Sequence, residues 1–151
     1  MGAVQQIASQ PCGDATAYRI VQETDVPWML ALAKRRYSNR WDFEAAEMWF
    51  ESVVLRQPLV FYPIRSDNSF VVTLISIIPW MPAEWEANVV WCCADDGAMW
   101  EALALLRESL AWAKRRKCVE WRFRSETDFD TGPMARRLGA HELPTNYAVR
   151  L

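Results

Sequence analysis

The spacing of hydrophobic residues changes from helical to alternating along the chain. Between residues 98 and 117, Met99, Leu103 and Leu106 recur every three or four positions opposite charged residues, a pattern typical of an amphipathic helix. The segment that follows, 118–124, alternates apolar and charged residues, which predicts a strand. The chain therefore mixes helices with strands and belongs to the α/β class.

The same criteria, with prolines, glycines and polar clusters as boundaries, divide the whole chain into elements. We expect strands at 17–22, 59–64, 70–78, 86–93, 118–124, 140–143 and 147–151, and helices at 26–37, 42–55, 98–117 and 133–138. The predicted order is thus β-α-α-β-β-β-α-β-α-β-β, with 79–82 as a rigid connection. Residues 1–16 show no periodicity and are expected to be a loosely ordered leader before a single domain, 17–151.

Two strand pairings follow from the residues in the strands. Aromatic and β-branched residues in 59–64 and 70–78 flank a polar turn, which predicts an antiparallel hairpin. The run 89–93 has no polar face, as expected of a central strand covered on both sides. Because a long helix connects this strand to 118–124, the two should lie side by side and parallel. The sheet should be mixed and mainly antiparallel, with helices on its faces.

Composition and charge narrow the classes of function. The chain has 151 residues and a formal net charge of −2, so no overall positive field favours nucleic acid, which we do not expect as a partner. The apolar run 70–78 is too short for the ~20 residues of a membrane-spanning helix, and the N-terminal segment lacks the features of a secretory signal. We therefore expect a cytoplasmic protein without a membrane partner. The four cysteines show no C-x-x-C spacing, and no metal site is expected.

Two segments and the order of elements resemble a known superfamily. The first strand and helix begin with YRIVQETDVP (18–27), and the last short helix reads MARRLGA (134–140). Over 17–151 the chain is similar to the GNAT superfamily of acyl-CoA-dependent N-acetyltransferases, and within it to the short GNAT-like proteins of bacteriophages. The resemblance implies a GNAT-like sheet flanked by helices. It also implies either acetyl transfer from acetyl-CoA to an amine or, for the phage proteins, a role in particle assembly.

The loop before the long helix is where the resemblance implies a cofactor site. In the family this loop follows the pattern Gln/Arg-x-x-Gly-x-Gly/Ala, and its backbone N–H groups and the helix start hold a pyrophosphate. The residues implied to contact a cofactor here are Cys93, Gly97, Ala98 and Met99. Asp95 and Asp96 stand where the phosphates would approach, and as helix caps they would compete for the same amides. We therefore expect weak acetyl-CoA binding or none, and a protein that acts by binding partners, with an active N-acetyltransferase as the alternative.

Acetyl transfer would also need a base and an acid. The family often draws its base from the strand before the long helix, where Glu84 and Glu86 are available. Many members carry a tyrosine about four residues before the glycine of the last short helix, and this tyrosine acts as the acid that protonates the leaving thiolate. Ala135 occupies that position here. Tyr147 or Ser125 could replace it, and the spacing selects neither. The candidate catalytic residues are Glu84, Glu86 and Tyr147.

Tryptophan is the residue type that points to a contact surface. Nine tryptophans are more than one core of this size encloses, so some should lie at the surface. We expect that at least two of Trp28, Trp41, Trp49, Trp80 and Trp85 form a surface for self-association or a protein partner. The basic run 114–117 closes the long helix, where cations complement the negative end of the helix dipole.

Overall fold

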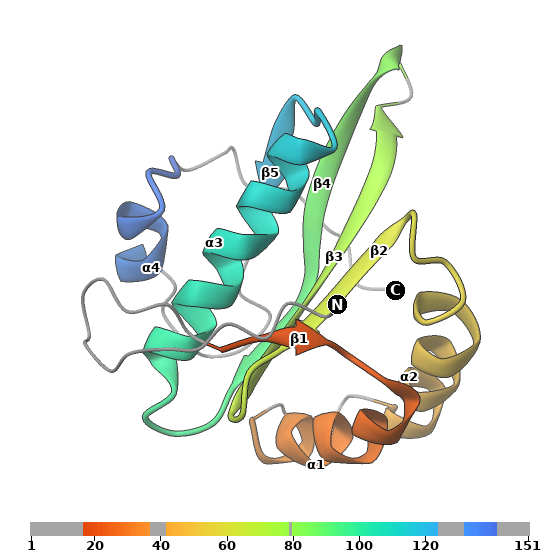
Figure 1. Ribbon diagram of the computed structural model, residues 1–151, viewed down its shortest axis with the longest axis vertical. Helices are drawn as coiled ribbons and strands as arrows, with labels where there is room; N and C mark the ends of the chain where they lie inside the picture. The colour runs from red at the N-terminus through yellow and green to blue at the C-terminus, as the bar shows by residue number, and fades with distance from the viewer. Residues whose placement is uncertain (1–16, 37–41, 79, 124–131, 142–151) are drawn as a thin grey trace, which may run out of the picture.

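The computed structural model describes residues 17–36, 42–78, 80–123 and 132–141, and its five strands form one sheet in the order β1-β2-β3-β4-β5 (Figure 1). The strands are β1 (Arg19–Ile20), β2 (Phe61–Arg65), β3 (Ser69–Ile78), β4 (Met81–Ala94) and β5 (Glu120–Arg122). The helices are α1 (Val26–Arg36), α2 (Phe43–Trp49), α3 (Met99–Arg115) and α4 (Gly132–Arg137). A 3₁₀ turn, Glu23–Asp25, precedes α1, and a π-helical turn, Phe50–Val54, continues α2. The predicted order is confirmed from β1 to α4.

The strand pairings match the two that the sequence predicts. Strands β1 to β4 pair antiparallel, and β4 pairs parallel with β5. The start of β4 was predicted wrongly at residue 86. Met81 pairs with Ile78 directly across the turn, so the expected connection 79–82 is the tip of a long β3–β4 hairpin. Strand β5 is also shorter than predicted, because only three of its residues pair with β4.

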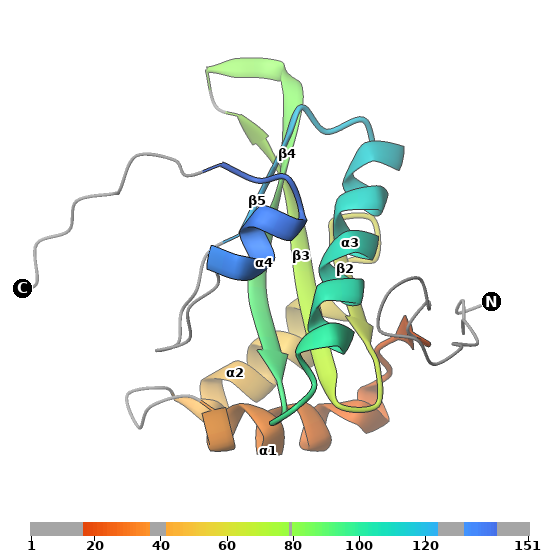
Figure 2. The same ribbon diagram turned by 90° about the vertical axis from the view of Figure 1, so that its left-hand side faces the viewer.

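The sheet separates two layers of helices. Figure 2 shows α3 on one side of the sheet and α1 with α2 on the other. The α3 side holds a core of Ile64, Val71, Val89, Leu103, Leu105, Leu106 and Met134. The opposite core includes Met29, Leu32, Phe50, Phe70, Val72, Trp91 and Cys93. Each face of the central strands is thus buried, as the strand with no polar face requires.

A buried carboxylate fixes the start of α1. Asp25 accepts two hydrogen bonds from Arg19, at 2.5 and 2.6 Å, one from Arg65 at 2.9 Å, and one from the Gln22 N–H at 2.7 Å. Burial alone would raise the pKa of Asp25, but the bonds from Arg19 and Gln22 outweigh it and the pKa is lowered. The ionised Asp25 therefore joins the start of α1 to β1 and β2.

A hydroxyl cluster joins α3 to the sheet. The buried hydroxyls of Thr73 on β3 and Ser109 on α3 lie 2.6 Å apart, and Trp121 Nε1 on β5 donates to Ser109 Oγ at 2.8 Å. Each of these polar groups is satisfied without water, so the contact tolerates burial. The cluster sets β5 against both β3 and α3.

The C-terminal elements are described only in part. Gly139, at φ +72°, ends α4 as the sequence predicts, because a left-handed residue closes the helix there. Ala140 and His141 lie in no strand, contrary to the predicted strand 140–143, and the predicted strand 147–151 lies outside the described residues. Across the described ranges, no helix combines the length and apolar character needed to cross a membrane.

Candidate functional site

A β-bulge in β4 changes which residues face each side of the sheet. Val72 pairs with Trp91 but Thr73 pairs with Val89, so Val90 is an extra residue. Val89 packs on the α3 side, while Val90 and Trp91 both pack on the α1 side. A bulge bends its strand and redirects side chains, and bulges are frequent next to functional sites.

The bulge lies where β4 loses its contact with β5. Strand β5 pairs with β4 only through residues 86–88. In the part of the chain that the structure describes, β4 continues through Ala94 with no strand paired on this side. The backbone polar groups along this edge are therefore available to a ligand.

A turn of four residues leads from β4 into α3. The Ala98 N–H donates to Asp95 O at 3.0 Å, and Gly97 adopts φ +77°, which favours glycine. The turn is anchored to the β2–β3 loop, where Asn68 O accepts from the Asp95 N–H at 2.9 Å and the Asn68 amide donates to Glu101 at 3.1 Å. The turn is thus fixed at one end by a backbone hydrogen bond and at the other by the Glu101 side chain.

The start of α3 is uncapped, and this corrects the sequence prediction. Ala98 is the N-cap residue and no side chain accepts a hydrogen bond there, whereas Asp95 or Asp96 was predicted to cap the helix. The first N–H groups of a helix have no partner within it. They carry the positive end of the helix dipole and form an anion site in principle.

The two acidic residues are engaged elsewhere. Asp95 Oδ2 lies 3.1 Å from Arg35 Nη2, and Asp96 is paired with Arg36. Both arginines come from the last turn of α1. A hydrogen bond from the Asp96 N–H, together with the charges of Arg35 and Arg36, lowers the pKa of Asp95. Both carboxylates are therefore matched by cations, and they do not occupy the α3 amides.

The structure brings together part of the predicted cofactor set. Gly97, Ala98 and Met99 form the turn and the first residue of α3. The side chain of Cys93 is buried in the α1-side core, so only its backbone faces the edge of β4. Burial raises the pKa of Cys93 to about 12, which excludes a thiolate nucleophile near neutral pH.

Of the predicted catalytic residues, Glu86 lies at the first paired position of β4 and β5, and its carboxylate reaches toward Arg122, the last paired residue of β5. Its carboxylate accepts from Asn88 at 3.3 Å and lies 3.7 Å from Arg122 on β5. Its side chain remains 20 % exposed. Glu84 lies nearer the hairpin tip, half-buried. Tyr147 lies outside the described residues.

The predicted surface tryptophans separate into two groups. Trp28 packs edge-on against Phe70 with Arg65 3.5 Å above its ring, and Trp49 packs against Phe61 at 5.8 Å. These two half-buried rings pack against the border of the core. Trp80 and Trp85 on the β3–β4 hairpin are exposed. Trp41 lies outside the described residues.

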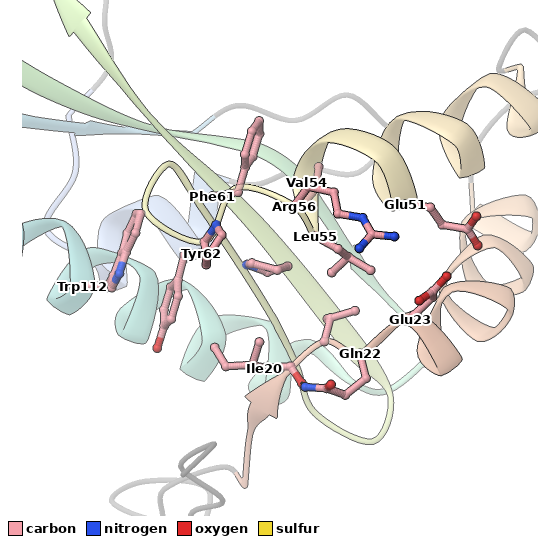
Figure 3. Close-up of a pocket in the computed structure, with 13 residues that line it drawn as sticks. Ile20, Gln22, Glu23, Glu51, Val54, Leu55, Arg56, Phe61, Tyr62 and Trp112 are labelled. Atoms are coloured by element: carbon pink, nitrogen blue, oxygen red, sulfur yellow. The ribbon is translucent and has the colours of Figure 1, made fainter.

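A separate groove of about 470 Å³ lies at the opposite edge of the sheet, between β1, β2 and the π-helical turn (Figure 3). Figure 3 shows Tyr62 and Trp112 at one end and Glu23, Glu51 and Arg56 toward the other. None of the predicted site residues lines it. Desolvation and a hydrogen bond to Glu108 raise the pKa of Tyr62, so this hydroxyl is a poor acid. Over the described ranges no cluster of three or more His, Cys, Asp and Glu could hold a metal ion.

Comparison of the whole fold with solved structures identifies its type. The aminoglycoside 6′-N-acetyltransferase of Acinetobacter haemolyticus superposes with a TM-score of 0.68 over 90% of this chain and 98% of its own, at 17% identity. The glucosamine-6-phosphate N-acetyltransferase of Arabidopsis thaliana gives 0.69 over 88% and 96%, at 8% identity. The chain has the GNAT acetyltransferase fold.

Sequence comparison adds no closer relative to this GNAT fold. A ribosomal-protein-alanine N-acetyltransferase of Brucella melitensis is similar in the same way, with a TM-score of 0.66 over 91% of this chain and 99% of its own, at 15% identity. No protein-family model matches the sequence, and no curated protein matches it. At such identities the similarity establishes the GNAT fold alone, so the activity has to be inferred from the residues of the site.

Two features of this site are not predictable from the sequence pattern. The bulge at Val90 falls inside a continuous apolar run, where no polar residue marks the change of face. The pairing of Asp95 and Asp96 with Arg35 and Arg36 joins residues sixty positions apart. The sequence shows two adjacent aspartates and two adjacent arginines, but only the fold shows that they form ion pairs.

Proposed function

We propose that this protein is an N-acetyltransferase that transfers an acetyl group from acetyl-CoA to an amine. The observation that carries the proposal is the uncapped start of α3 directly after the bulged strand β4. The GNAT fold supports it, because the solved structures with this fold include N-acetyltransferases for an aminoglycoside and for glucosamine 6-phosphate. When bound, acetyl-CoA supplies an activated thioester to the incoming amine.

The loop residues fit a pyrophosphate on backbone groups. The N–H groups at Gly97, Met99 and Trp100 meet no side-chain acceptor among the described residues. A Cβ on Gly97 would meet no atom within 4 Å, so the space beside the turn is open. An anion at such a helix start is held by oriented amides and by the helix dipole.

The acidic residues are compatible with an anion because their charges are matched. A lone carboxylate near a phosphate would repel it, but each of Asp95 and Asp96 has a guanidinium partner, so the two pairs carry no net charge. Trp100 also leaves the turn open, since Arg137 lies 4.7 Å from its ring and draws the ring toward α4. Neither the two aspartates nor the bulky Trp100 therefore closes the space beside the turn.

Glu86 is the residue best placed to act as the base. An amine must lose a proton to attack, and a carboxylate that reaches toward the last β4–β5 pair can accept it. Arg122 and Asn88 orient this carboxylate. Replacing Glu86 by Gln should lower kcat while leaving acetyl-CoA affinity unchanged. Glu120→Gln is the matched control, because Glu120 shares the partner Arg122 at 2.5 Å. The role of Tyr147 as the acid stays a prediction.

Two glycines allow a matched test of the loop. Gly97 and Gly139 both have positive φ and neither has an atom within 4 Å of a Cβ. Alanine at either position should therefore cost about 1–2 kcal/mol of stability through the backbone alone. We expect Gly97→Ala to weaken acetyl-CoA binding in calorimetry and Gly139→Ala to leave it within twofold.

The sequence favoured partner binding by a GNAT-fold protein with a degenerate loop, as in phage particle assembly, and this function is the alternative to the proposed acetyl transfer. Its physical basis was the competition of Asp95 and Asp96 for the α3 amides, and the pairing of both residues with α1 removes that basis. If neither acetyl-CoA nor CoA produces heat of binding, and Gly97→Ala behaves like Gly139→Ala, the acetyltransferase proposal fails and partner binding takes its place.

A further inference from the structure

The face of the sheet that α3 covers continues beyond the end of that helix. Ile77 on β3 pairs with Trp85 on β4, and the Val119 N–H donates to Trp85 O at 2.9 Å. Because side chains alternate along a strand, these three share a face with Ile75 and Ala87, which pack beneath α3. They form the next row of one apolar surface.

This next row has no cover in the described structure. Ile75 is 5 % exposed, whereas Ile77, Trp85 and Val119 are 47 %, 43 % and 53 % exposed. Both views show the β3–β4 hairpin projecting past the end of α3 (Figures 1 and 2). Trp80 and Met81, at its tip, are also exposed. We call these five residues the hairpin patch: Ile77, Trp80, Met81, Trp85 and Val119.

A group of cations borders the hairpin patch. Residues 114–117 are all exposed at the end of α3, and the chain turns at Lys117, with φ 59°, to reach Val119 two residues later. Arg115 is paired with Glu108 at 2.6 Å. Among the described residues, Lys114, Arg116 and Lys117 have no carboxylate partner. The Arg116 guanidinium lies 5.3 Å from the centre of the Trp112 ring.

The carboxylates near the patch do not balance these cations. Glu86 and Glu120 both lie against Arg122. Glu84 is the remaining acid on the hairpin strand. Glu86 and Glu120 share one arginine, so with Glu84 two carboxylate charges stand against the three cations Lys114, Arg116 and Lys117, which are unpaired within the described ranges. The end of the molecule that carries the hairpin patch therefore combines exposed tryptophan and aliphatic side chains with a small excess of positive charge, gathered on one side at residues 114–117.

We propose that the hairpin patch docks this protein on an anionic lipid surface. Tryptophan is favoured at the boundary between headgroups and acyl chains, aliphatic side chains gain by entering that layer, and lysine and arginine are attracted to anionic lipid. Charge complementarity favours this occupant over a second copy of the chain, since a symmetric contact would bring two groups of unpaired cations together. Nucleic acid would leave Ile77, Met81 and Val119 without a base to stack on.

The geometry differs from what the sequence alone suggested. The sequence predicted no membrane partner, indicated a protein contact for Trp80 and Trp85, and explained the basic run by the helix dipole; the proposal departs from all three. The fold places the basic run beside Trp85 through Val119, which neither pattern reveals. The proposed docking also leaves the N-terminal end of α3 free, because it lies at the opposite end of the helix (Figure 1).

Vesicle co-sedimentation tests this proposal. The full-length protein would be mixed with vesicles of phosphatidylcholine alone, or of phosphatidylcholine and phosphatidylglycerol in equal parts. We expect binding to the mixed vesicles, weakened when salt is raised from about 0.1 M to about 0.5 M. Changing Trp80 and Trp85 together to Ser should abolish binding. Changing Lys114, Arg116 and Lys117 to Gln should weaken it, by about fivefold for each cation that contacts the headgroups.

The controls make each outcome decisive. Trp100→Ser removes a tryptophan that is 47 % exposed at the other end of α3, and it should bind vesicles as the unmodified protein does. Equal loss with Trp100→Ser, or no binding to the mixed vesicles, would overturn the proposal. The proposal would also be overturned if the protein did not bind vesicles but formed a concentration-dependent dimer in sedimentation, and if the Trp80 and Trp85 double variant lost that dimer. A third contrary result is that the protein binds poly-glutamate as tightly as it binds the mixed vesicles, with no loss in the Trp80 and Trp85 double variant. That result would overturn the proposal, because it would show that charge alone accounts for the binding.

Discussion

The two ends of α3 differ in whether their charged side chains are paired. At its N-terminal end, two carboxylates are matched by two guanidinium groups, and the backbone amides of the turn are left without a side-chain acceptor. At its C-terminal end, four cations follow one another, and only Arg115 has an acidic partner among the described residues. The first end has its side-chain charges matched in pairs, whereas the second keeps three cations, Lys114, Arg116 and Lys117, with no acidic partner in the part of the chain that the structure describes.

This difference shows that net charge does not identify an anion site by itself. An exposed lysine or arginine attracts anions weakly and without fixed geometry, and salt screens the attraction. Oriented amides at a helix start hold an anion in one position at a smaller formal charge. This is why we propose a pyrophosphate site at the end with oriented amides and a diffuse anionic surface at the end with the unpaired cations.

The largest expected effect separates the covered and uncovered rows of the α3 face. Ile75 and Ile77 lie two residues apart on the same side of β3, but only Ile75 is buried. Ile75→Ala should cost about 2–5 kcal/mol of unfolding free energy through the lost burial and the cavity. Ile77→Ala should cost less than about 1 kcal/mol. Urea unfolding of both variants measures this, and equal losses would show that the hairpin patch is core.

A smaller effect concerns the arginines of α1. Without Arg35 and Arg36, the carboxylates of Asp95 and Asp96 would lose their partners beside the turn. Changing both arginines to Gln should weaken acetyl-CoA binding by about tenfold. The matched control removes two cations at the other end, Lys114→Gln with Lys117→Gln, and should change the affinity less than about twofold. Similar losses in the two double variants would mean that overall charge governs binding.

The smallest effect is on the protonation of Asp95. The hydrogen bond from the Asp96 N–H is the leading cause of its lowered pKa, and the charge and hydrogen bond of Arg35 add to it. The Asp95–Arg35 pair should therefore persist above the ordinary carboxyl pKa and be lost as the pH falls through the lowered value. Carbonyl NMR titration should show that Arg35→Gln raises the pKa of Asp95 only in part. A return to the ordinary value would contradict the role of the Asp96 N–H.

Much of the fold is predictable because local patterns specify it. The alternation near Trp121 and the helical period of 99–106 place β5 and α3, and the intervening helix makes β4 and β5 parallel. The failures occur where pairing overrides composition. Two prolines suggested a rigid connection at 79–82, but the cross-strand partners Ile78 and Met81 extend the hairpin to its tip.

The site is less predictable than the fold because it depends on contacts between distant segments. The sequence predicted that Gly97, Ala98 and Met99 lie at the start of the long helix, and they do, because they are adjacent in the chain. An aspartate before a helix is usually its cap, so the sequence favoured that role for Asp95 or Asp96. Two arginines from α1 compete for the same carboxylates, and the ion pairs are formed in place of the cap.

The most direct test of this account is to map where CoA binds by backbone amide NMR. Titration of the ¹⁵N-labelled protein with acetyl-CoA should shift the amide signals of Gly97, Ala98 and Met99 first and most. The signals of Lys114 and Lys117 should stay nearly unchanged, although that end of α3 carries more positive charge. Shifts centred on the basic run, or no shifts at millimolar acetyl-CoA, would contradict the assignment of the cofactor to the amides of the α3 start.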